Sequence, residues 1–202
     1  ADGSIAEEIT FSRGKRDGRS TLWLTPEEKE EEKFFKNGKL DGPSTFWDNG
    51  FRKTMTTYKF DSPEGPWVIW YSDSDQMKEQ GFHQEGIREG LTTYYYEDGT
   101  MQREGFFKSG LADGIWTYWN SKGEKDFDFD FGTGLQHIEL EDLAERESIF
   151  YKIGDERPFT GIITQENPEA DYLFLGRTKE GKKDGQWVKW FPDGKDVPEI
   201  IL

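Results

Sequence analysis

The sequence predicts an all-β fold: a single-layer antiparallel meander of tandem β-hairpin repeats, elongated and curved. A glycine recurs at spacings of 24, 23, 25 and 24 residues, and a period of roughly 20–50 residues is typical of repeat proteins. Side chains after each glycine alternate as they do along β-strands. Only 33% of residues are hydrophobic but 16% are aromatic, so large rings supply much of the apolar area. The recurring glycines are Gly18, Gly42, Gly65, Gly90, Gly114, Gly161 and Gly185.

Each repeat begins with a strand that follows this glycine. β-Branched residues occupy all seven third positions after the glycine, and aromatic residues occupy six of the seven fifth positions, so the two columns share one strand face. The aromatic column consists of Trp23, Trp47, Trp70, Tyr95, Trp119 and Trp190. The opposite face carries Leu22, Phe46, Ile69, Tyr94 and Tyr118.

Two turns complete the repeat. The turn after the first strand carries Gly50, Gly99, Gly123 and Gly194, and Asp-Gly or Asn-Gly supplies the positive φ angles of tight hairpins. A second strand that ends in aromatic residues leads to the second turn, as in residues 36–42 and 108–114. The segment 81–125 contains two successive copies of this pattern, shifted by 24 residues.

The repeat pattern is interrupted between residues 126 and 149. Residues 126–131, DFDFDF, predict a strand with phenylalanine on one face, and residues 132–134 predict a flexible joint. Residues 138–148 are the stretch that suggests a short helix. We therefore expect an N-terminal repeat array at 1–131, a joint with a short helix at 132–148, and C-terminal repeats at 149–202.

No residue pattern indicates catalysis, a metal site or a cofactor. The histidines, His83 and His137, have no metal-ligand spacing, and His83 occupies a position that is aromatic in other repeats. The chain lacks cysteine, which excludes disulfides and thiolate metal sites. Acidic residues before the recurring glycines are expected to cap turn amides, since one carboxylate per repeat cannot supply the ligands of Ca²⁺. We expect a non-enzyme.

The charge of the chain restricts its partners. Acidic residues outnumber basic ones by 41 to 26, giving a formal net charge of −15. Nucleic acids and anionic membranes are bound through lysine and arginine, so this composition disfavours both. A protein with a basic surface is the partner that the charge favours.

The aromatic column has two interpretations, of which the packing role is favoured. Its rings pack neighbouring hairpins together, or they form a stacking surface for a partner's side chains or for a sugar. A curved sheet allows both roles, with a groove lined by tryptophan on the concave face.

The tandem pattern resembles the MORN-repeat superfamily, and more closely its bacterial variant repeat. The resemblance lies in Glu104–Gly123 (EGFFKSGLADGIWTYWNSKG), in Gly176–Lys195 (GRTKEGKKDGQWVKWFPDGK) and in Asp142–Gly161 (DLAERESIFYKIGDERPFTG). It extends in degenerate copies over roughly Phe11–Lys195. It implies a curved single-layer sheet of hairpins, an antitoxin-like label from the bacterial variant family, and membrane or protein scaffolding from eukaryotic relatives. The strongly negative charge departs from a lipid-binding version.

These observations lead to one expected function and one alternative. We expect a non-catalytic protein-binding or scaffolding module, of undetermined oligomeric state, that uses the concave face. The alternative is a carbohydrate or cell-wall binding module that uses exposed tryptophan and tyrosine. The chain begins at Ala1, which leaves two expected locations: export to the cell envelope after removal of a leader, or otherwise the cytoplasm.

Overall fold

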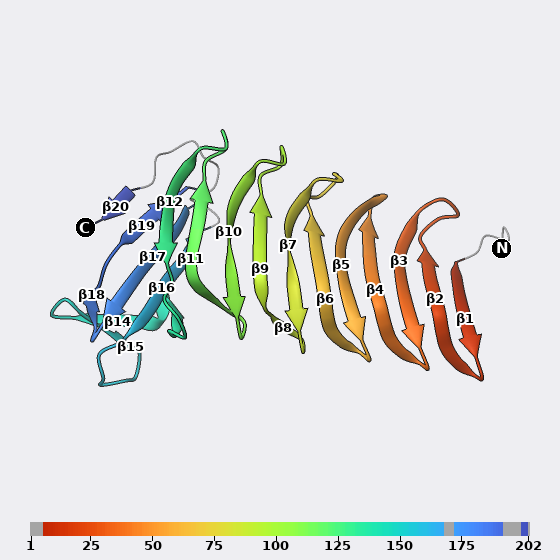
Figure 1. Cartoon of the computed structure of the whole chain (residues 1–202), viewed down its shortest axis with the longest axis horizontal. Helices are drawn as coiled ribbons and strands as arrows, with labels where there is room; N and C mark the ends of the chain where they lie inside the picture. The colour runs from red at the N-terminus through yellow and green to blue at the C-terminus, as the bar shows by residue number, and fades with distance from the viewer. Residues whose placement is uncertain (1–5, 168–171, 192–198, 202) are drawn as a thin grey trace. The chain divides into compact units, whose positions relative to one another are not determined.

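A computed structural model describes residues 6–167, 172–191 and 199–201 of the chain. The chain forms two compact units, Ala1–Gly99 and Thr100–Leu202. Strands β1 to β12 follow one another as a 12-stranded antiparallel meander that is not closed into a barrel (Figure 1). The predicted all-β hairpin architecture is therefore confirmed.

The first unit contains a sheet with no second layer over the residues that the structure describes. Its strands are β1 (Glu7–Ser12), β2 (Lys15–Trp23), β3 (Lys29–Lys36), β4 (Lys39–Asp48), β5 (Phe51–Lys59), β6 (Ser62–Trp70), β7 (Met77–Gln84), β8 (Ile87–Arg88) and β9 (Gly90–Tyr95). Asn37 and Gly38, which join β3 to β4, have φ angles of 52° and 88°. Two successive positive φ angles define the hairpin turn whose twist matches that of the flanking strands.

Four of the seven recurring glycines lie at β-bulges. The register shifts opposite Gly18, Gly42, Gly65 and Gly114, between Ile9 and Phe11 in the first case. Gly42 has a φ of 126°, and a Cβ there would lie 2.9 Å from the Cβ of Phe34. The repeat period thus reflects a backbone conformation that other residues adopt only with strain.

The second unit is built from two packed layers. Its elements are β10 (Met101–Lys108), β11 (Leu111–Trp119), β12 (Lys125–Asp130), β13 (His137–Glu139), the 3-10 helix η1 (Leu140–Asp142), β14 (Leu143–Arg146), β15 (Ile149–Lys152), β16 (Gly161–Asn167), β17 (Tyr172–Lys179), β18 (Lys182–Lys183), β19 (Trp187–Trp190) and β20 (Glu199–Ile201). A second sheet has the order β13-β16-β17-β19-β20, with β18 paired to β17.

The two layers of the second unit pack against each other through aromatic side chains. Phe127 and Phe129 on β12 are 6% and 1% exposed, as the alternating DFDFDF segment predicts. Tyr118 on β11 stacks on Phe127 at 4.5 Å, and Trp190 on β19 meets Tyr118 edge-on at 5.0 Å. Tyr118 and Trp190 are nearly inaccessible to solvent, so this contact is part of the core.

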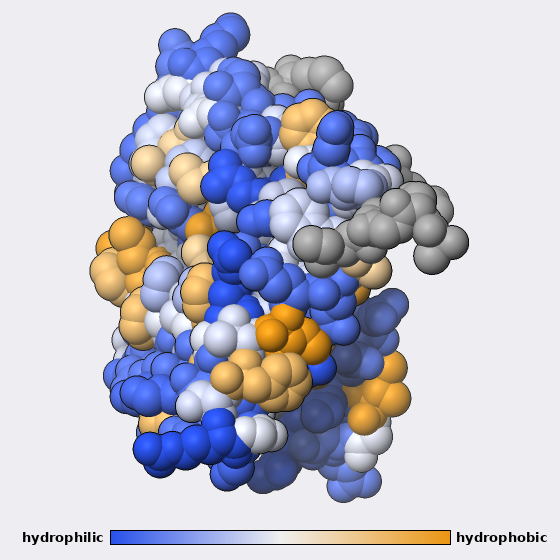
Figure 2. All heavy atoms as spheres, turned by 90° about the vertical axis from the view of Figure 1, so that its right-hand side faces the viewer, coloured by the Kyte–Doolittle hydropathy of each residue, from blue (hydrophilic) through white to orange (hydrophobic). Residues whose placement is uncertain are grey.

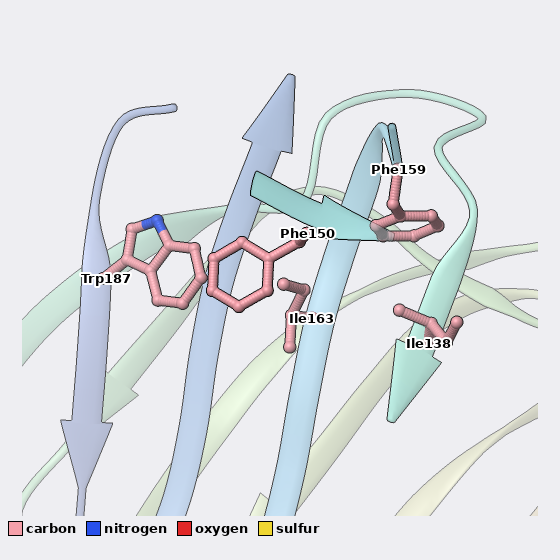
Figure 3. Close-up of a cluster of buried hydrophobic side chains, with 5 residues drawn as sticks. All are labelled: Ile138, Phe150, Phe159, Ile163 and Trp187. Carbon is pink, nitrogen blue, oxygen red and sulfur yellow. The ribbon is translucent and has the colours of Figure 1, made fainter. Parts of the chain in front are cut away.

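The other face of the second sheet has a core of its own. Ile138, Phe150, Phe159, Ile163 and Trp187 form a buried cluster that joins β13, β15, β16 and β19 (Figure 3). Phe150 stacks on Trp187 with ring centroids 5.6 Å apart. The β14–β15 hairpin is thereby fixed against the sheet through Phe150.

Residues 132–148, the predicted joint, differ from the prediction in their place in the chain's two units and in their secondary structure. Residues 132–148 lie inside the second unit, whereas the two units meet in the sequence after Gly99. The carbonyl of Gly132 accepts a hydrogen bond from the Gly114 amide at 2.8 Å, so this glycine is held against β11. In place of the expected helix at 138–148, the chain forms β13, one 3-10 turn and β14. Gly194, which was predicted to form a turn, lies outside the described residues.

Candidate functional site

The first unit carries a row of tryptophans on one face of its sheet. Trp23 pairs with Lys29 across β2 and β3, and Trp47 pairs with Arg52 across β4 and β5. A register shift precedes each of these tryptophans, as it does for Trp70. Trp23 and Trp47 are half-buried, whereas Trp70 is 8% exposed.

Cations alternate with the rings of this row. The Lys29 ammonium lies over both Trp23 and Trp47, at 5.7 and 5.4 Å from the ring centroids. The Arg52 guanidinium lies 4.9 Å from the centroid of Trp70 and also pairs with Asp75 at 3.3 Å. A cation over an indole is attracted by the ring quadrupole, so each contact links neighbouring strands. We call Trp23, Lys29, Trp47, Arg52 and Trp70 the tryptophan row.

Three residues of the predicted aromatic column, Tyr95, Trp119 and Trp190, do not belong to the tryptophan row. Tyr95, on β9 of the first unit, receives a hydrogen bond on its hydroxyl from Gln80 Nε2 at 2.6 Å. Trp119 belongs to the second unit, where it is half-buried and pairs with Lys125. Trp190 is fully buried, and its Nε1 donates to Asp126 at 3.2 Å. Trp190 therefore packs the core and is not available to a partner.

Three further buried tryptophans occupy a different column. Trp67, Trp116 and Trp187, two residues after the recurring glycine, are 3%, 3% and 2% exposed. Trp116 lies flat on Gly105, and its Nε1 donates to the Phe106 carbonyl at 3.1 Å. Trp187 repeats this arrangement with Gly176 and the Arg177 carbonyl. For Trp116 and Trp187, a glycine 11 residues before the tryptophan is the sequence signal that identifies this packing position, whereas Trp67 packs against Gly81, which follows it.

The acidic residues before the glycines cap neighbouring turns. Asp17 accepts a hydrogen bond from the Asn37 amide at 3.1 Å, Glu64 from Glu85 at 2.8 Å, and Asp113 from Gly134 at 3.3 Å. These bonds link residues 20 or 21 positions apart, so each carboxylate connects one turn to the next. Over the described residues, no group of three or more His, Asp or Glu side chains is arranged to hold a metal ion.

The histidines lie in aromatic surroundings. His83 is tilted against Trp67 with centroids 5.6 Å apart, and burial, followed by the nearby Arg88 charge, lowers its pKa. His137 stacks on Phe131 at 5.5 Å, and burial lowers its pKa although a bond to the Ala112 backbone opposes the shift. Both rings therefore favour the neutral form.

Comparison with known families finds a match to one segment of the chain. Residues 88–109 match the family model described as the MORN repeat variant. The matched segment covers β9 and β10 with the turn between them, which is one hairpin of the meander. This segment is thus a MORN-type repeat, and the fold around it is a repeat-type module. No curated protein matches the chain.

The surface near the β1 end is mostly hydrophilic, with hydrophobic residues in small separate groups (Figure 2). Within the part of the chain that the structure describes, no helix is long and apolar enough to cross a membrane. The tryptophan row is the candidate contact surface, because it combines regular spacing with the partly exposed rings of Trp23 and Trp47.

Proposed function

We propose that the chain is a non-catalytic module that binds a partner protein with a basic surface through the tryptophan row of the first unit. The observation that supports this most strongly is the row itself: tryptophans at matching positions of successive hairpins, of which Trp23 and Trp47 are half-buried, on a sheet face without a second layer over the described residues. Tryptophan and arginine are the residues most enriched at the energetic centres of protein interfaces.

The charge supports a basic partner. The row is flanked by carboxylates such as Glu32, which pairs with Lys29 at 2.8 Å, and Asp75, which pairs with Arg52. With 41 acidic and 26 basic residues in the chain, the summed field attracts a cationic surface.

The contacts between Lys29 and the tryptophan rings make carbohydrate binding, the alternative function, less favourable. Sugar binding by stacking requires an open ring face, and Lys29 lies over both Trp23 and Trp47. A protein side chain can still contact the ring edges and the remaining ring surface. We therefore retain protein binding as the proposed function.

The test uses adjacent residues on opposite faces of β4. Trp47 belongs to the tryptophan row, whereas Phe46 precedes it on the other face and is 42% exposed. Extracts of the source organism are passed over the parent chain, Trp47→Ala and Phe46→Ala, after circular dichroism has shown that each is folded. We expect a protein that is retained by the parent and by Phe46→Ala but lost with Trp47→Ala. Equal retention by all three would contradict binding through the row.

A further inference from the structure

The second unit contains a cavity that the tryptophan row does not involve. Its volume is about 500 Å³, within the range of roughly 300–1,000 Å³ found for ligand sites. It lies at β13, the strand that ends the second sheet, and Leu111 from β11, Lys152 from β15 and Phe159 also line it. All of these residues belong to one compact unit.

Part of the cavity wall is apolar. Ile138 and Phe159 are 9% and 7% exposed and belong to the buried cluster of the second sheet (Figure 3). Leu111 is 41% exposed and adds an aliphatic side chain. These side chains provide a surface against which a hydrocarbon chain can pack.

Charged groups complete the wall. Glu139 and Asp142 contribute two carboxylates, and Lys152 contributes one ammonium group. The Thr164 hydroxyl donates to Glu139 Oε1 at 2.8 Å, which orients that carboxylate. None of the ion pairs among the described residues includes Glu139, Asp142 or Lys152.

We propose that this cavity binds a lysine or arginine side chain of the partner, an inference that rests on the proposed function. The aliphatic stem of such a residue packs on Leu111, Ile138 and Phe159, while its cationic head meets Glu139 and Asp142. Lysine and arginine are the side chains that join an apolar stem to a positive end, and the excess of carboxylate over ammonium in the wall favours them. The cavity would then supply a second point of contact with a basic surface.

The two histidines allow a direct binding experiment with the full chain. His137 lines the cavity, whereas His83 lies in the first unit and serves as an internal control. Their ring resonances are followed by NMR during titration with N-acetyl-arginine amide, and in parallel with neutral N-acetyl-norleucine amide. We expect a saturable shift of His137 with the arginine compound, a weaker response to the norleucine compound, and no change at His83.

Variants test the role of the carboxylates. The double substitution Glu139→Gln and Asp142→Asn should weaken binding of the arginine compound at least about tenfold, because the charge-assisted contacts are lost. Glu145→Gln, on β14 outside the cavity wall, should leave the affinity unchanged. An unshifted His137, an equal response to both compounds, or equal affinity in the double variant would overturn the inference.

The outcome is separable from that of the proposed function. If Trp47→Ala loses the partner while the double cavity variant retains it at full affinity, the cavity inference fails and the function of the row stands. If the cavity variant weakens partner binding and Trp47→Ala does not, the row hypothesis fails, and binding through the cavity stands on its own.

Discussion

At the scale of single residues, glycine and tryptophan act as a pair. Gly105 and Gly176 have no side chain, and this lets the indoles of Trp116 and Trp187 lie directly on the neighbouring strand. An indole with this much buried area is a major source of stability in a sheet with little other core. The glycine is therefore needed for space and not for a positive φ angle.

Gly105→Ala tests this pairing. An added Cβ would lie 2.3 Å from Cγ of Trp116, so the ring must move, and overpacking of this kind costs about 2–3 kcal/mol. Gly134→Ala is the control, because nothing lies within 4 Å of its Cβ position and only its left-handed backbone adds about 1 kcal/mol. Urea unfolding should rank Gly105→Ala as clearly less stable. Equal losses would mean that the Trp116 site tolerates a methyl group.

His83 makes stability depend on pH. Its pKa in the folded chain lies below the ordinary 6.5 because burial disfavours the charged ring, and the Arg88 charge acts in the same direction. The stability contributed by the neutral ring is thus complete above pH 6.5 and is lost as pH falls toward the folded-state pKa. Phe107, 24 residues after His83, is the aromatic residue at the matching repeat position, and its ring meets Trp116 on the following strand edge-on.

His83→Phe should consequently reduce the loss of stability on acidification. We expect the urea midpoint to fall less between pH 8 and pH 5.5 in this variant than in the parent. His137, whose pKa is also lowered by burial, should account for part of the remaining pH dependence. The interpretation of His83 is wrong if the variant and the parent lose the same stability over this interval.

At the scale of elements, the sequence predicts the hairpins but not the second layer. Glycine spacing and alternating side chains are local signals, and they correctly indicate strands and turns along both units. The parallel pairing of His137–Glu139 with Ile162–Thr164 joins distant segments and has no local signal. For the same reason residues 138–148 look helical in isolation, whereas Leu140 and Leu143 pack against the buried cluster instead.

The candidate site was predictable only in part. Period-two alternation identifies Trp23 and Trp47, but it does not show that Trp190 is buried by Tyr118 and Phe127 from another sheet. Register shifts beside the tryptophans are also invisible in the sequence, and they place Lys29 opposite Trp23 and Arg52 opposite Trp47. The cavity depends on long-range packing and has no motif.

Limited proteolysis tests the element that interrupts the repeats. The β14–β15 hairpin is a two-stranded sheet of four-residue strands, and such a hairpin has little stability of its own. Its turn residues Glu147 and Ser148 are exposed. We expect trypsin or a glutamate-specific protease to cut first within 145–148, before any cut in the hairpins of 81–125. First cleavage inside those hairpins would show that the interruption is the more stable part.

At the scale of the whole molecule, charge determines which partners can approach. The net charge of −15 should repel phosphate backbones and anionic lipids, so we expect no binding to DNA, RNA or acidic liposomes at physiological salt. Association with a basic protein should slow as salt rises, because screening shortens the field to about 8 Å near 0.15 M. Stopped-flow or biosensor measurements over a salt series would show this. An association rate that does not change with salt would contradict a role of the charge in partner binding and would indicate that it serves solubility alone.

The most direct test of binding through the tryptophan row is the affinity of the purified partner for matched variants. Trp47 and Phe46 are neighbours on opposite faces of β4, so their alanine substitutions sample the two faces of the sheet at one position in the chain. We expect Trp47→Ala to raise the dissociation constant at least about tenfold, equivalent to about 1.4 kcal/mol, and Phe46→Ala to leave it unchanged. Unchanged affinity for Trp47→Ala, or a larger loss for Phe46→Ala, would contradict the assignment of this face.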